Sequence, residues 1–243
     1  MPYSYPQTID RREAPQLVRH LIPGALAMAA TAGFINSVAL GFFRTPVSHM
    51  TGAVSHLGLD IVSGRARDAF ASLAIVTGFV AGAMIAGALV GARKLVPSRR
   101  YGFVLATEGM LIGIATWLLV TRHRLGLPAV AMACGLQNAM SSSYCGLVIR
   151  TSHVTGLVTD VGVMLGHWLR HRTVEWPKLR FLAALFLAFG AGGMFGAYLD
   201  IHYGPIVLIV PAVGCGVAGL VFWWLVDRGY RRGVVAATDG THV

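Results

Sequence analysis

The sequence predicts an all-α, polytopic membrane protein. Of its 243 residues, 55% are hydrophobic and only 12% are charged, and the mean hydropathy is +0.64. A soluble globule of this size would need more polar side chains to cover its surface. The apolar runs are long and rich in Ala, Leu, Gly and Val, which indicates membrane helices and not the short alternating strands of a barrel.

Six apolar runs approach or exceed the roughly 20 residues that cross the hydrocarbon core of a bilayer. Only one of them is interrupted by a charge, at Glu108. The first run follows a polar segment without an evident small-residue cleavage site, so we expect it to remain in the mature protein. The six runs are Leu21–Phe43, Ala69–Ala92, Tyr101–Thr121, Leu127–Ile149, Phe181–Leu199 and Pro205–Val226.

The net charge of +10 lies mostly in tails and short loops between the apolar runs. This distribution is typical of the positive-inside rule and not of a basic nucleic-acid groove, for which no folded domain is left over. Cys134, Cys145 and Cys215 all lie within apolar runs and have no C-x-x-C spacing, so they indicate packing residues. We therefore expect the lipid bilayer as a partner, no nucleic acid, no cofactor and no bound metal.

The chain contains one pattern twice. The segment His49–Gly58 recurs as His153–Gly162, a shift of 104 residues. Each copy follows an Arg-Thr pair and an apolar helix with an Asn, and precedes a glycine-rich apolar helix. This old duplication divides the chain into a polar tail (1–19), a first membrane repeat (20–124), a second membrane repeat (125–228) and a C-terminal tail (229–243). The flanking matches are Gly33–Asn36 with Gly135–Asn138, Arg44-Thr45 with Arg150-Thr151, and Ala81–Met84 with Ala191–Met194.

The duplicated segment decides the topology. Residues 45–64 carry hydroxyl, imidazole and carboxyl side chains after Pro46, so this stretch cannot face lipid along its whole length. If it crosses fully, the chain has eight spans and parallel repeats. If it turns back, each repeat has three full spans plus one broken or short helix, and the repeats are inverted. The four positive charges of Arg93–Arg100 lie inside only in the second arrangement, so we favour six spans with both termini in the cytoplasm.

Two half-helices that begin near Ser48 and Ser152, with Ser or Thr as N-caps, would present free N–H groups and positive dipole ends near the midplane. In an inverted pair these ends form a pocket suited to an anion or a carboxylate, with Arg44 and Arg150 nearby. Any single polar residue here could instead bond a neighbouring helix. The duplicated set favours function, because polar groups in lipid are costly. The predicted substrate-binding residues are Asn36, His49, Thr51, Asn138, His153 and Thr155.

Three acids interrupt apolar surroundings: Asp60, Glu108 and Asp160. An intramembrane carboxylate is a candidate carrier of a proton or cation. Asp160 corresponds to His56 in the first repeat, and an acid and an imidazole at matching positions suit a proton-coupled cycle. We therefore predict His56, Asp160 and Glu108 as coupling residues. For Asp60, a plain ion pair with nearby Arg65 is an equal alternative.

Three glycine motifs predict close helix packing: Gly78-x-x-x-Gly82, Gly87-x-x-x-Gly91 and Gly192-x-x-x-Gly196. A homodimer formed through these glycine-rich helices is a further expectation.

The paired motifs resemble those of the YoaK-like family of uncharacterised bacterial membrane proteins. The resemblance covers about residues 20–228 and rests on Gly33–Asn36 leading into His49–Gly52, and on Gly135–Ala139 leading into Thr151–Gly156. It implies a bacterial cytoplasmic-membrane protein of about six spans, without a substrate. The family usually has Asp where Asn36 stands and Asn where Ala53 stands, so a mechanism that needs a carboxylate in the first helix does not carry over.

The sequence thus favours a transporter or channel for a small solute, with an anion as the best-suited form. The alternatives are a membrane-embedded enzyme that acts on a lipid-like substrate, using His49, His56, His153 and Asp160, and a structural membrane subunit. The chain has no G-x-x-x-x-G-K-[ST] motif, and neither G-x-S-x-G nor H-E-x-x-H occurs. ATP-driven pumping and embedded proteolysis are therefore disfavoured.

Overall fold

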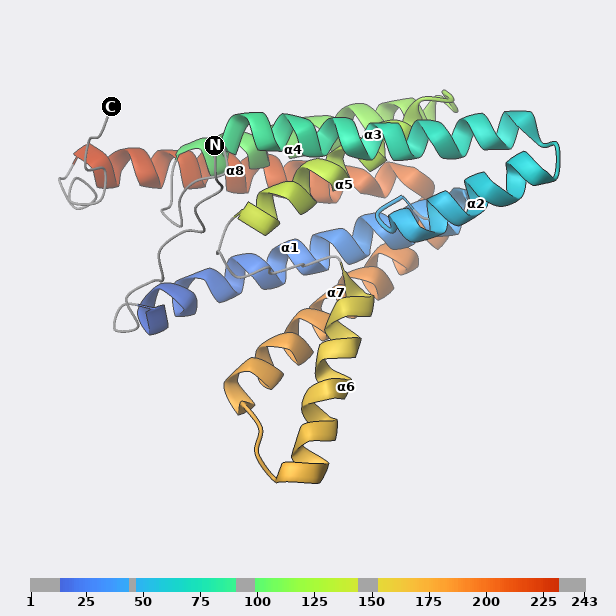
Figure 1. The fold of residues 1–243 in the computed structure, drawn as a ribbon. Helices are drawn as coiled ribbons and strands as arrows, with labels where there is room; N and C mark the ends of the chain where they lie inside the picture. Colours follow the sequence, from blue (N-terminus) through green and yellow to red (C-terminus); the bar gives the residue numbers. More distant parts are fainter. Residues whose placement is uncertain (1–13, 44–46, 91–98, 144–152, 232–243) are drawn as a thin grey trace, which may run out of the picture.

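The computed structural model describes residues 14–43, 47–90, 99–143 and 153–231. Within these ranges the chain forms α-helices and one 3-10 helix, η1, and no strand, which confirms the all-α prediction there (Figure 1). The elements are α1 (Ala14–Phe43), α2 (Met50–Val62), α3 (Ala66–Val90), α4 (Arg99–Val120), α5 (Gly126–Ser143), α6 (Val154–His171), α7 (Trp176–Tyr203), η1 (Gly204–Leu208) and α8 (Ile209–Arg231).

Four described stretches are long and apolar enough to cross a membrane: Ile22–Gly41, Ala66–Val90, Arg99–Val120 and Trp176–Arg228. The last comprises α7 and α8, which are separated where Gly204, with a φ of 71°, and Pro205 start η1. These stretches support the predicted helical membrane protein. The run predicted at 127–149 is helical as far as Ser143. Helix α5 is not among the four stretches, because Gln137, Asn138 and its last serines lower its hydropathy.

Helix α2 has 13 residues, which gives a length of about 20 Å and is too short for a hydrocarbon core of about 30 Å. It ends in a Schellman motif: the N–H of Gly64 donates to the Ile61 carbonyl and the N–H of Arg65 to the Asp60 carbonyl. Gly64 takes a φ of 69°, which glycine adopts without strain. This tight turn folds α3 back along α2.

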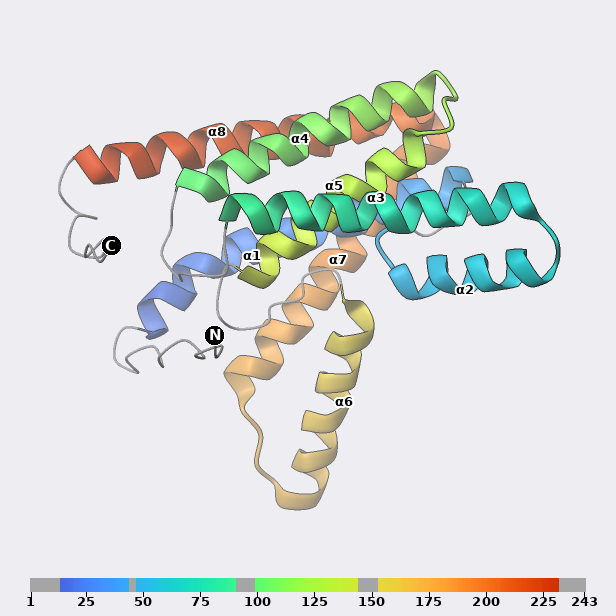
Figure 2. The ribbon, with the colours of Figure 1, turned by 45° about the horizontal axis from the view of Figure 1, so that its top comes forward.

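The helices pack in pairs that join the two halves of the chain. Helix α1 packs along α7, α3 along α5, and α4 along α8, and α4 also touches α5. Among the described elements, α2 packs only on α3 and α6 only on α7, so the α6–α7 hairpin projects from the body (Figure 2). In Figure 1, α1, α4 and α7 run from left to right, whereas α3, α5 and α8 run from right to left.

Two of the three glycine motifs serve packing within the chain. A Cβ at Gly82 would overlap the Met132 carbonyl of α5, and a Cβ at Gly192 would overlap the Ala30 carbonyl of α1. These glycines bring the helix backbones into close contact. In the third motif, a Cβ at Gly87 would meet open space, and Gly91 lies outside the described residues. Of the three motifs, the third alone leaves a glycine in the described chain free for the expected homodimer.

Candidate functional site

Each of the two repeated segments begins a helix with a histidine at the N-cap position. His49 is the N-cap of α2 and His153 is the N-cap of α6, and neither makes a side-chain cap hydrogen bond. The expected Ser or Thr cap is wrong for α2, since Ser48 uses its hydroxyl elsewhere. The serine expected to cap α6, Ser152, lies outside the described residues. At the start of α2 the N–H of Gly52 donates to the His49 carbonyl at 3.0 Å. The N–H groups of the first residues of a helix have no i−4 carbonyl within the helix.

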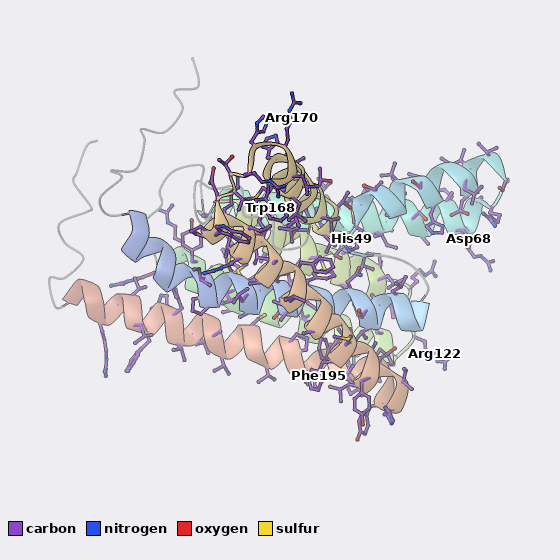
Figure 3. All side chains as sticks on the ribbon, turned by 90° about the horizontal axis from the view of Figure 1, so that it is seen from below. His49, Asp68, Arg122, Trp168, Arg170 and Phe195 are labelled. Atoms are coloured by element: carbon purple, nitrogen blue, oxygen red, sulfur yellow. The ribbon has the colours of Figure 1, made fainter. Side chains whose placement is uncertain are left out.

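The two helix starts lie near each other in the middle of the molecule. The imidazoles of His49 and His153 are close enough for a Coulomb interaction, and the His49 ring lies 6.0 Å from the Phe189 ring of α7. Figure 3 shows His49 in this central position, whereas Asp68 and Arg170 mark the far ends of the α2–α3 and α6–α7 hairpins. The α2 and α6 helices then diverge, each along its own partner. Sequence reasoning did not identify Phe189, because nothing in its apolar run distinguishes it.

The two asparagines of the repeat, Asn36 and Asn138, have buried side chains. Ser48 Oγ donates to Asn36 Oδ1 at 2.8 Å, and both side chains are buried. This bond ties the residue before His49 to the C-terminal third of α1. In the second repeat Asn138 is also buried and has an interaction partner, and Ser141 Oγ donates to the backbone carbonyl of Asn138 at 3.0 Å. The two asparagines therefore lie inside the helix packing.

Gln137 is a further buried amide that the site prediction omitted. Its Nε2 donates to the Met28 carbonyl of α1 at 3.3 Å, and its side chain is fully buried. This bond joins α5 to α1, the corresponding first helices of the two repeats. A polar residue beside Asn138 in an otherwise apolar run was the signal that could have identified it.

The remaining predicted residues lie on the surface of the chain. Thr51, His56, Thr155 and Asp160 are exposed, and so is His153. Since α2 packs on α3 and α6 on α7, helix packing does not bring His56 and Asp160 together among the described residues. The convergent helix starts are therefore open on one side. Arg44 and Arg150, which were expected near the anion pocket, lie outside the described residues.

The three acids that interrupt apolar surroundings in the sequence occupy different environments. Asp60 is buried and its Oδ1 accepts from the Arg65 guanidinium at 2.7 Å, so the plain ion pair is the correct interpretation. Asp160 is exposed on α6. Glu108 is completely buried. Its Oε1 lies 3.7 Å from Cys215 Sγ of α8, and its Oε2 has no hydrogen-bond partner.

Asp200, near the end of α7, is an acid that the site prediction omitted. Its Oδ1 is buried without a hydrogen-bond partner, and its carboxylate lies against the α1 backbone, since a Cβ at Gly41 would be 2.9 Å from Oδ2. Its place directly after the apolar run that ends at Leu199 was the sequence signal that could have identified it. Within the described ranges, no group of three or more His, Cys, Asp or Glu side chains lies close enough together to hold a metal ion.

Comparison with known proteins gives a family and no function. No curated protein matches the chain, and no solved structure matches it. The model of a family described as a protein of unknown function, DUF1275, matches residues 24–221. These residues include both helix starts, both buried asparagines and Glu108, so the site lies within the matched range. The chain belongs to the DUF1275 family.

Proposed function

We propose that this protein is a membrane transporter or channel for a small solute, and that an anion or a carboxylate is the form it binds. One observation carries the proposal: two helices begin near each other, with His49 and His153 at their N-cap positions and no cap hydrogen bond from either imidazole. The site is the space between these two starts, with Thr51 and Thr155 in the first turns.

The chemistry of this arrangement favours negative charge. The first N–H groups of a helix have no acceptor within the helix, and the macrodipole places about half a positive charge at this end. Two such ends that converge act on the same bound group. Each imidazole adds a hydrogen-bond donor, and a bound anion would offset the repulsion between two protonated rings.

We also propose that the halves are inverted repeats, which suits alternating access around a fixed central site. The corresponding helices α1 and α5 run in opposite directions, as do α3 and α7, and α4 and α8. Corresponding contacts support the same relation. A Cβ at Gly33 would overlap the Phe189 carbonyl, and a Cβ at the corresponding Gly135 would overlap the Phe79 carbonyl.

Anion flux through reconstituted protein tests the proposal. Purified protein in liposomes is challenged with chloride, phosphate or succinate, and currents are recorded on a solid-supported membrane. The variant His49→Ala/His153→Ala removes both donors, each worth about 1.5 kcal/mol or more to a charged ligand. We expect the current from the responding anion to fall by roughly tenfold or more.

The matched control is His167→Ala/His171→Ala, which removes two exposed imidazoles from α6 that contact each other away from the site. This variant is expected to retain the wild-type current. Wild-type currents that survive the first double substitution would refute the site. A wild type that is silent towards all three anions would refute the anion as the solute.

A further inference from the structure

Glu108 lies at the centre of the packing between the two halves. It is the tenth residue of the 22-residue helix α4, about 14 Å from the helix start, so it is close to mid-span. Its side chain has no exposed surface. Cys215 of α8 faces one carboxyl oxygen at 3.7 Å, and the other oxygen has no partner.

The helices around Glu108 meet through glycine. A Cβ at Gly109 would lie 2.5 Å from the Ala212 carbonyl oxygen, and a Cβ at Gly102 would lie 2.7 Å from the Gly219 carbonyl oxygen. Helix α4 belongs to the first repeat and α8 to the second, so this contact joins the two halves. If α4 and α8 part at this contact, water reaches the carboxyl group.

Among the described residues, no cation pairs with this carboxyl group. The titratable groups that face it are two thiols, Cys215 of α8 and Cys134 of α5. The charged side chains of α8 lie at its C-terminal end, away from Glu108. There Asp227 pairs with Arg99. Helix α3 has its charges in its first turn, and η1 has none. A carboxylate without a countercharge in this setting is strongly disfavoured, whereas the protonated acid is tolerated.

We propose that Glu108 is a proton-binding site, and that it couples proton movement to the solute transport proposed above, on which this coupling role rests. The structure then corresponds to an occluded, proton-loaded state. When the α4–α8 contact opens, the carboxyl O–H bond breaks, the electron pair stays on the carboxylate oxygen, and the proton passes to water. Reprotonation from the opposite side completes the cycle.

Infrared spectroscopy of the full-length protein in lipid tests the proton site without any solute. A protonated carboxylic acid has a carbonyl band separate from the amide bands. We expect Glu108→Gln, a near-isosteric change, to remove one such band, and Cys215→Ala to shift it to higher wavenumber by removing the thiol donor. Asp68→Asn, an exposed acid on α3, is the control and should leave the band unchanged. A band that persists in Glu108→Gln would overturn the proposal.

Coupling is tested separately with a pH-sensitive dye inside the proteoliposomes, under inward gradients of chloride, phosphate or succinate. Wild type should acidify the lumen with the transported anion, and Glu108→Gln should lose this acidification. Acidification at the wild-type rate in Glu108→Gln would overturn the coupling role even if the band is lost. A wild type that moves no anion would refute the proposed function instead, and the infrared band alone would then decide the proton site.

Discussion

Gly196 gives the sharpest test of how the two halves pack. This glycine of α7 faces α1, and a Cβ there would lie 2.7 Å from the Phe34 carbonyl oxygen and 3.0 Å from the Phe34 Cα. Ordinary contact begins at 3.4 Å, so Gly196→Ala must push the backbones apart by about 0.7 Å. Helix backbone cannot yield as a flexible side chain does, and overpacking of this kind costs about 1–3 kcal/mol.

The matched control is Gly190→Ala, six residues earlier on α7, where an added Cβ meets nothing within 4 Å. Alanine should stabilise an open helix position by about 1 kcal/mol relative to glycine. Gly196→Ala gains the same helix propensity of about 1 kcal/mol, which partly offsets the clash. At the upper end of the overpacking range, about 3 kcal/mol, the net destabilisation is therefore about 2 kcal/mol. For a chain of this size, that lowers the unfolding temperature by roughly 4–8 °C.

The assay is thermal unfolding in one detergent, followed by tryptophan fluorescence at a fixed scan rate, because membrane proteins often unfold irreversibly. Gly192→Ala, whose Cβ would overlap the Ala30 carbonyl, should lower the midpoint further than Gly196→Ala. If Gly196→Ala unfolds at or above the midpoint of Gly190→Ala, the close α1–α7 packing is wrong.

Two other predictions follow from the helix starts and the topology. Ser48→Ala should destabilise the protein by about 1–3 kcal/mol in the same thermal assay, because it leaves the buried Oδ1 of Asn36 without its donor. The control is Ser55→Ala, which removes an exposed hydroxyl from α2 and should change the unfolding midpoint little. Equal midpoints for the two variants would contradict the role of this bond. Inverted repeats place the α4–α5 and α6–α7 turns on opposite sides of the membrane. In an otherwise cysteine-free chain, we therefore expect His123→Cys and Arg172→Cys to be labelled from opposite sides. Labelling of both from one side would support eight spans and parallel repeats.

Much of the fold could be predicted from hydropathy alone. The apolar runs predict the helices closely: the run predicted at 101–121 is α4, and those at 181–199 and 205–226 lie within the stretch that η1 divides. The repeat of His-x-Thr-Gly located both helix starts, since α2 begins at Met50 and α6 at Val154. These features depend on local composition and on distances along the chain, which the sequence contains directly.

The environment of each polar residue could not be predicted in the same way. Asp60, Glu108 and Asp160 all interrupt apolar surroundings in the sequence, yet one forms an ion pair, one is completely buried and one is exposed. Their differences come from which residue on another helix faces each carboxyl group. For Glu108 that residue is Cys215, 107 positions away.

The sequence by itself therefore determined that this chain is helical, that it belongs in lipid, and that a polar motif occurs in both halves, because a bilayer imposes length and polarity on each segment separately. Only the tertiary structure decided that His49 and His153 lie near each other, that Ser48 bonds Asn36 instead of capping α2, and that the glycines of α3 and α7 contact the opposite half. These contacts depend on how the packed helices are rotated and positioned. The glycine motifs predict close packing, but they do not say which helix lies opposite.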